Sequence, residues 1–118
     1  MEQTTAAGPL AAGLNLFVYG TLCEAALVRR LTGRSFAMEA AVLSGYRRFE
    51  PPGSYAYITP DATSEVHGLV LRNIDAAALR AFDAYEEAGQ LYRRVEVQVT
   101  VGAQIEAAQA YIGLAVAR

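Results

Sequence analysis

Runs of alternating apolar and polar residues predict about six strands in this chain. The clearest run is LYRRVEVQVTV, residues 91–101, in which Arg93, Val95, Val97 and Val99 share one face and Arg94 lies on the other. A strand with this pattern covers a core with its apolar face. The other β-prone runs are residues 14–20, 38–50, 55–59, 64–73 and 105–116.

Two features punctuate these predicted strands. Gly45 lies inside the run 38–50, where we expect a β-bulge or a close approach of another backbone segment. The sequence PDAT, residues 60–63, predicts a turn between two separate strands, because proline and aspartate favour turns. The predicted sheet therefore contains mainly strands that are neighbours in the sequence.

Helical spacing predicts two helices. Residues 23–33, CEAALVRRLTG, have apolar positions at helical intervals and end at Gly33, a typical residue after the last turn of a helix. Asp75 precedes the second helical run and can cap it. We expect this second helix to continue through AAALRAFDAYEEA to Gly89.

Together the elements predict an α+β fold, a small mixed β-barrel of about six strands flanked by two main helices. Residues 1–13, MEQTTAAGPLAAG, are small, polar and interrupted by glycine and proline, and we expect a flexible N-terminal tail there. Residues 14–118 are expected to form a single domain, since 118 residues suffice for one hydrophobic core.

Charge and composition exclude several classes of function. The formal net charge is −2 and no polybasic run occurs, so we expect neither nucleic acid nor an anionic membrane as a partner. All ten basic residues are arginine. The absence of lysine excludes a Schiff-base lysine and the lysine of a phosphate-binding P-loop. The sequence gives no indication of the oligomeric state.

The cysteine and histidine content limits redox and metal chemistry. Cys23 is the single cysteine and His67 the single histidine, so the chain cannot form an intrachain disulfide and a zinc site of cysteine and histidine ligands is improbable. Residues 1–13 lack the basic start of a signal peptide, and no apolar run reaches the roughly 20 residues of a membrane span. We therefore expect a cytoplasmic protein.

Glu86 is the first candidate for chemistry. Leu79, Phe82, Asp83 and Glu86 follow helical spacing, so Glu86 continues an apolar stripe. A carboxylate on a buried face has a raised pKa and suits general acid–base catalysis. The alternative is a glutamate in a frayed last turn that simply reaches solvent.

The turn YGTL, Tyr19 to Leu22, is the second candidate. It follows a predicted strand and precedes a predicted helix, so its backbone N–H groups could hold a carboxylate or a phosphate. The alternative is an ordinary strand-to-helix turn in which Gly20 supplies an unusual dihedral angle.

The remaining polar residues allow less specific readings. Cys23 with His67 as a base would make a thiol enzyme, but the favoured interpretation is a partly buried small residue and a histidine on a strand face. One of Arg93 and Arg94 must point toward the more apolar side of its strand. There it needs a carboxylate partner, such as Asp83 or Glu86; otherwise it is a surface arginine.

Five segments in this order resemble a known family: LFVYGTL, LSGYRRF, VHGLVL, LRAFDAYEEAGQLYRRVEV and AYIG. The sequence resembles the γ-glutamylcyclotransferase-like family, in particular its short branch that includes the γ-glutamylamine cyclotransferases. The match extends from about residue 16 to residue 112. The resemblance implies a small mixed barrel flanked by helices.

The resemblance also implies a reaction. In active members the free α-amine of a γ-glutamyl group attacks its own γ-carbonyl, which releases 5-oxoproline and the amine that was attached there. By motif match, Glu86 is the acid/base residue, and Tyr19, Gly20, Thr21 and Leu22 hold the substrate. Tyr92 and Arg94 match the family's Tyr-x-Arg element, with Arg93 as the alternative arginine. The expected partner is a small γ-glutamyl molecule, and no metal or organic cofactor is required.

Two departures from the family pattern stand out. Glu87 occupies a position where many relatives have glycine, and a second carboxylate there would disfavour acidic substrates if it faced the site. Ala56 stands where relatives often carry proline. The loop EPPGSYAY is expected to contact the leaving amine. A non-catalytic small-molecule-binding or regulatory domain on the same scaffold is the alternative function, and a structural module with an exposed Glu86 is the third.

Overall fold

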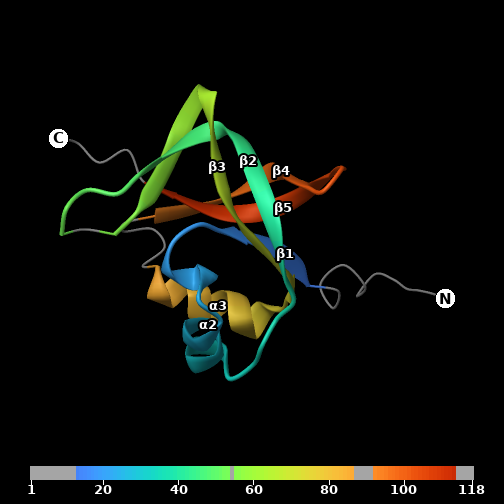
Figure 1. The fold of residues 1–118 in the computed structure, drawn as a ribbon. Coiled ribbons are helices and arrows are strands. Elements are labelled where there is room, and N and C mark those ends of the chain that lie inside the picture. The colour runs from blue at the N-terminus through green and yellow to red at the C-terminus, as the bar shows by residue number, and fades with distance from the viewer. Residues whose placement is uncertain (1–12, 54, 87–91, 114–118) are drawn as a thin grey trace.

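The computed structural model describes residues 13–53, 55–86 and 92–113 (Figure 1). Apart from Gly13, the predicted tail lies outside these residues. Eight elements follow one another: β1 (Leu14–Val18), η1, a single 3₁₀ turn (Thr21–Cys23), α2 (Ala25–Thr32), β2 (Met38–Phe49), β3 (Tyr57–Ile74), α3 (Ala76–Tyr85), β4 (Tyr92–Val101) and β5 (Gln104–Gly113).

The strands close into a barrel in the order β1-β3-β2-β4-β5. Strands β1 and β5 pair in parallel and the other pairs are antiparallel, so the sheet is mixed. Closure between β2 and β4 rests on one register position, Val42 opposite Thr100. Helices α2 and α3 lie together on one side of the barrel, below β1 in Figure 1. The predicted α+β barrel with two flanking helices is thus confirmed.

The described residues contain five strands, and the prediction of about six was wrong at one place. The two strands expected on either side of PDAT are one continuous strand, β3. Its pairing with β2 jumps from Glu65 to Pro60, so residues 61–64 bulge out opposite Gly45. Turn chemistry is present, since Asp61 Oδ1 accepts hydrogen bonds from Thr63. Residues 61–64 form a bulge instead of a turn between two strands, because the segments on both sides of them pair with β2.

The bulge predicted at Gly45 is confirmed, and Gly45 has a φ of 88° there. Helix α2 ends as predicted at Gly33, whose φ is 75° and whose N–H donates to the carbonyl of Arg29 at 2.7 Å. The Asp75 side chain caps α3 by accepting a hydrogen bond from the Ala78 N–H at 2.9 Å. Helix α3 ends at Tyr85 and Glu86 is already a turn residue, whereas residues 87–89 of the predicted helix lie outside the described residues.

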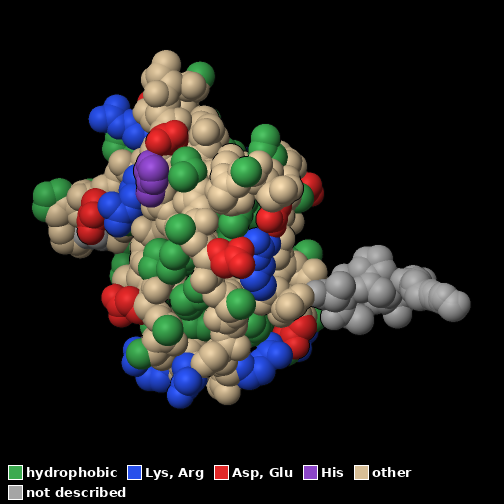
Figure 2. Space-filling view, turned by 45° about the vertical axis from the view of Figure 1, so that its right-hand side comes forward, with side chains coloured by type: hydrophobic (Ala, Val, Ile, Leu, Met, Phe, Trp, Pro, Cys, Tyr) green, Lys and Arg blue, Asp and Glu red, His purple; other side chains and the backbone are tan. Residues whose placement is uncertain are grey.

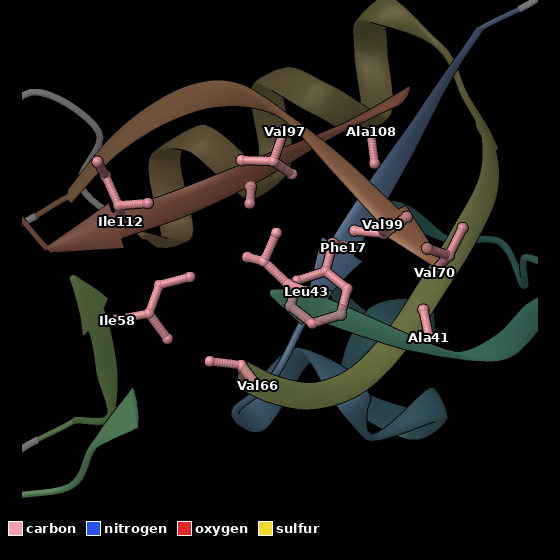
Figure 3. Close-up of a cluster of buried hydrophobic side chains, with 11 residues drawn as sticks. Phe17, Ala41, Leu43, Ile58, Val66, Val70, Val97, Val99, Ala108 and Ile112 are labelled. Atoms are coloured by element: carbon pink, nitrogen blue, oxygen red, sulfur yellow. The ribbon is translucent and has the colours of Figure 1, made fainter. Parts of the chain in front are cut away.

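Two apolar clusters hold this arrangement together. The first fills the barrel, where side chains from β1, β2, β3, β4 and β5 point toward one another (Figure 3). The second lies between the barrel and the helices and includes Leu16, Leu22 and Phe82. Strand β1 contributes to both clusters, with Phe17 inside the barrel and Leu16 on the helix side. The strand that leads into the YGTL turn is therefore fixed from two directions.

Strand β4 also has two buried faces near the site. Val97 and Val99 belong to the barrel interior, whereas Tyr92 belongs to the cluster under the helices. The alternation predicted from the sequence of β4 is confirmed. Tyr92 and Arg94 consequently face α3, and Arg93 is exposed.

Candidate active site

A cavity of about 440 Å³ lies between the turn after β1 and the end of α3. This volume is in the range of pockets that enclose small molecules. The cavity wall brings together residues that are far apart in the sequence. They include six of the seven predicted site residues: Tyr19, Gly20, Thr21, Leu22, Glu86 and Tyr92.

The YGTL turn is built by β1 and η1. The N–H groups of Cys23 and Glu24 donate to the carbonyls of Gly20 and Thr21, each at 3.0 Å. Among the described residues, no acceptor pairs with the N–H groups of residues 20–22. Gly20 has a φ of −126°, so the turn does not depend on a left-handed glycine. These amides are consequently available to a ligand in the cavity.

Helix α3 holds the other side of the turn. The Thr21 hydroxyl and the Tyr85 hydroxyl share a hydrogen bond at 2.8 Å. The Leu22 side chain is buried in the cluster between helices and barrel. The turn and the end of α3 are thus joined, and the distance between residues 19–22 and Glu86 is set by packing as well as by one side-chain contact.

Glu86 follows the last residue of α3, and its N–H donates to the Phe82 carbonyl at 2.9 Å. Its side chain lines the cavity, and no hydrogen bond or ion pair to its carboxyl group occurs within the described parts of the chain. Burial raises the pKa of Glu86 from 4.5 to about 7. The structure places this carboxyl in the cavity wall, where it can take up or release a proton near neutral pH.

Three tyrosines surround Glu86 in the cavity wall. The Tyr19 hydroxyl donates to the Tyr111 carbonyl at 2.6 Å, and the Tyr92 hydroxyl donates to the Ala56 carbonyl at 2.7 Å. Burial raises the pKa of Tyr92 to about 12, and the negative charge of Glu86 adds to this shift. Burial likewise raises the pKa of Tyr19 and Tyr111. All three phenols therefore stay neutral near pH 7 and place no charge beside Glu86.

Arg94 is the predicted site residue that the structure places elsewhere. It does not line the cavity but donates to both carboxylate oxygens of Asp83, at 2.9 and 3.1 Å, and to Gln109 at 3.0 Å. Tyr111 donates its hydroxyl to Asp83 at 2.6 Å. Burial alone would raise the pKa of Asp83, but the hydrogen bonds from Arg94 and Tyr111 hold it below its usual value. Of the two carboxylates considered as partners, Asp83 binds the arginine.

The cysteine–histidine alternative finds no geometric support. Cys23 lines the cavity, and burial raises the pKa of its thiol, so the reactive thiolate is disfavoured. His67 does not line the cavity; it lies on the surface (Figure 2), where it contacts Glu65 at 2.9 Å. The structure does not bring the two side chains together.

Sequence reasoning missed several residues of the cavity wall. Arg48 on β2 donates from Nε to the Tyr19 carbonyl at 3.2 Å and from Nη1 to Glu50 Oε1 at 2.9 Å. Tyr55 and Tyr85 also line the cavity. The expectation that the loop EPPGSYAY contributes to the site pointed toward Glu50 and Tyr55. No sequence signal indicated Arg48, which reaches the site because the barrel brings β2 beside Tyr19.

The position of Glu87 relative to the cavity lies outside the described residues. Within the described ranges, no helix has the length and apolar character needed to cross a membrane.

Comparison with known proteins places the chain in a family. Residues 16–116 match the model of the family described as gamma-glutamyl cyclotransferase, AIG2-like. The chain is 40% identical to AIG2-like protein C of Arabidopsis thaliana over 90 residues, which cover 75% of this chain and 52% of that protein. It is 36% identical to Protein AIG2 C of the same plant over 86 residues, which cover 72% of this chain and 51% of the relative. The chain spans about half the length of these curated relatives.

Solved structures show the same fold. A solution structure of an Arabidopsis thaliana protein matches with a TM-score of 0.81 and 30% identity, covering 89% of this chain and 71% of that one. A crystal structure of an AIG2-like protein from Mus musculus has a TM-score of 0.75 at 19% identity, covering 88% of this chain and 79% of the mouse chain. A structure titled gamma-glutamyl cyclotransferase has a TM-score of 0.71 at 18% identity, covering 86% and 66%. The match of the family model to nearly the whole chain shows that this protein belongs to the gamma-glutamyl cyclotransferase, AIG2-like family.

Proposed function

We propose that this protein converts a γ-glutamyl amine or γ-glutamyl peptide into 5-oxoproline and a free amine. The observation that carries the proposal is the position of Glu86. Its partly buried carboxyl, without a partner among the described residues, lies in the wall of the same cavity as the free N–H groups of residues 20–22. Family membership supports the reaction class.

Glu86 serves as both base and acid in this reaction. As a carboxylate it accepts a proton from the substrate's α-ammonium group, and the freed nitrogen attacks the γ-carbonyl carbon. The protonated Glu86 then donates that proton to the departing nitrogen while the bond between carbon and nitrogen breaks. The attacking nitrogen, which carries a positive charge once the new bond has formed, gives up a second proton, and the departing amine takes it and leaves as an ammonium ion. Two protons thus move from the attacking to the departing nitrogen, and Glu86 ends as the carboxylate. A pKa of about 7 suits both halves of this exchange at neutral pH.

The turn after β1 holds the substrate's α-carboxylate in this proposal. The N–H groups of Gly20, Thr21 and Leu22 can donate to it because nothing in the described chain occupies them. The nucleophile belongs to the substrate, so the enzyme needs no reactive serine, cysteine or lysine. Because ring closure is intramolecular, holding the γ-glutamyl chain in a folded conformation removes much of the entropic barrier.

Tyr92 forms part of the neutral wall around the reacting atoms, and its oxygen can still accept a hydrogen bond from the substrate. Arg94 is assigned a different role from the one implied by the family's Tyr-x-Arg element. Its contacts with Asp83, three residues before Glu86, fix the end of α3. We therefore assign Arg94 to positioning Glu86 rather than to contacting the substrate.

Release of 5-oxoproline tests the proposal. Purified protein is incubated with γ-glutamyl amines, γ-glutamyl amino acids and γ-glutamyl dipeptides, alongside Glu86→Gln and the control Glu24→Gln, which changes another carboxylate of the cavity wall. We expect product from the wild type, a loss of about 100-fold or more in Glu86→Gln, and activity within about threefold in Glu24→Gln. Full activity in Glu86→Gln would refute the assigned role of Glu86.

A non-catalytic binding domain on the same scaffold makes a different prediction. Such a domain would gain thermal stability from γ-glutamyl compounds without releasing 5-oxoproline. A protonatable, partly buried carboxyl beside a carboxylate-binding turn gives no advantage to a protein that only binds, so we favour catalysis. Thermal stabilisation measured with the same compounds distinguishes the two functions.

A further inference from the structure

Arg48 is the one cation among the described residues that line the cavity. It belongs to β2, and its Nε donates to the Tyr19 carbonyl at 3.2 Å, which ties the side chain to the start of the YGTL turn. This hydrogen bond therefore fixes the position of the guanidinium group. A guanidinium fixed in the wall of a ligand cavity can form strong, charge-assisted hydrogen bonds with an anionic group on the ligand.

The present partner of Arg48 is weakly held. Nη1 donates to Glu50 Oε1 at 2.9 Å, and the side chains of Arg48 and Glu50 are 36% and 64% exposed. Exposed ion pairs contribute little to stability. Among the described residues, Nη2 has no acceptor. A carboxylate on a ligand can thus bind Nη2, or take the place of Glu50 on the outer edge of the guanidinium, at little cost.

Exposure indicates which part of the substrate reaches Arg48. Glu86 is partly buried, and the reacting atoms must lie against it under the proposed function. Glu50 and Tyr55 are 64% and 65% exposed, so this part of the cavity wall opens to solvent. The γ-glutamyl head occupies the inner part, and the departing amine extends outward past Arg48.

We propose that Arg48 forms a subsite for a carboxylate carried by the leaving amine, and that the preferred substrates are γ-glutamyl amino acids or peptides with that carboxylate close to the scissile bond. The inference rests on the proposed function. Glu50 acts as an internal carboxylate that occupies the subsite when no substrate is bound. It therefore competes with acidic leaving groups and tunes their affinity.

A matched pair of substrates isolates the carboxylate. γ-Glutamyl-alanine and γ-glutamyl-alaninamide have nearly the same shape and differ in the charge of the leaving group. For the wild type we expect a kcat/KM about tenfold or more in favour of γ-glutamyl-alanine, because one charge-assisted hydrogen bond changes affinity by about that factor or more. In Arg48→Gln this preference should disappear, mainly through a higher KM for γ-glutamyl-alanine.

Two further variants complete the test. Glu50→Gln removes the competitor, so we expect a lower KM for γ-glutamyl-alanine and little change for the amide. Arg93→Gln is the control, since Arg93 is exposed and does not line the cavity, and its preference should equal that of the wild type. The alaninamide substrate reports any general damage to the turn, because such damage lowers turnover of both substrates.

Several outcomes overturn the subsite. Equal wild-type kcat/KM for the two substrates would do so, and so would an equal loss for both in Arg48→Gln, which would assign Arg48 to the γ-glutamyl head or to the turn. The absence of 5-oxoproline from every substrate would instead refute the proposed function. In that event, thermal stabilisation by γ-glutamyl-alanine but not by its amide, lost in Arg48→Gln, would still support Arg48 as a carboxylate subsite, and its absence would refute it.

Discussion

Arg94 on β4 donates two hydrogen bonds, at 2.9 and 3.1 Å, to the carboxylate of Asp83 on α3. Asp83 lies three residues before Glu86. Tyr111 from β5 donates a third hydrogen bond to the same carboxylate at 2.6 Å. The last turn of α3 is thereby attached to two strands of the barrel. The position of Glu86 depends on this attachment, since Glu86 directly follows Tyr85, the last residue of α3.

Asp83→Asn should lower the free energy of unfolding by about 1–3 kcal/mol, because it leaves the partly buried Arg94 without its counter-charge. Both side chains are 28% exposed, so the loss stays below that of a fully buried pair. Urea denaturation measures it. The control is Arg34→Gln, which breaks the exposed pair of Arg34 with Asp75 and should change stability by less than about 1 kcal/mol. Equal effects of the two variants would contradict the anchoring role.

The stability of the protein should fall as the pH rises from about 4.5 through 7. Burial raises the pKa of Glu86 from 4.5 to about 7, so the folded protein binds this proton more tightly than the unfolded chain does. The stabilisation that this proton on Glu86 contributes is fully present below pH 4.5 and is lost above about pH 7. Relative to Glu86→Gln, the wild type should lose about 1–2 kcal/mol between pH 5 and pH 8, measured by denaturation at each pH. Parallel pH profiles for the two proteins would show that Glu86 is not perturbed.

Cys23→Ala should leave the release of 5-oxoproline within about threefold of the wild type. The thiol lines the cavity, but its pKa is raised by burial and no histidine accompanies it, so it has no part in the proposed proton transfers. Steady-state kinetics with the best substrate measures this. Complete loss of turnover in a variant that keeps its melting temperature would restore the thiol as a catalytic candidate.

Gly68→Ala should destabilise the barrel by more than about 2 kcal/mol. A Cβ atom at Gly68 would lie 2.2 Å from the Val18 carbonyl oxygen and 3.0 Å from the Phe17 ring, so backbone would have to move. Thermal unfolding measures the effect. His67→Ala, one residue earlier on the same strand and exposed, is the control and should change stability by about 0.5 kcal/mol or less. A stable Gly68→Ala protein would show that β1 and β3 can separate at low cost.

Local signals predicted much of the fold. Asp75 and Gly33 marked helix ends because their side-chain or backbone chemistry acts within one turn, and Gly45 marked a bulge for the same reason. Residues 60–64 misled the prediction, since Asp61 does make turn-type hydrogen bonds but β2 pairs with the chain on both sides. Long-range pairing decided that case, and local sequence does not contain it.

The same distinction between local sequence signals and long-range contacts applies to the candidate site. Helical spacing and the family motifs singled out Glu86 and the YGTL turn, and both line the cavity. Arg48 was missed because its position depends on the barrel closing around Tyr19. Arg94 was expected to hold substrate on the strength of its motif, whereas the structure shows it bound to Asp83. The sequence spacing showed that an arginine needed a partner, but two carboxylates were equally available to it.

The parallel pairing of β1 with β5 has a consequence for how the protein forms. Phe17 pairs with Ala110, and the Tyr19 hydroxyl bonds the Tyr111 carbonyl, across 93 and 92 positions of the chain. During synthesis, β1 can acquire β3 early but keeps one open edge until β5 has left the ribosome. Contacts this distant in sequence slow folding and leave strand edges exposed to other chains. The cavity beside the YGTL turn is accordingly among the last features to be completed, so the candidate site cannot form until nearly the whole described barrel has emerged.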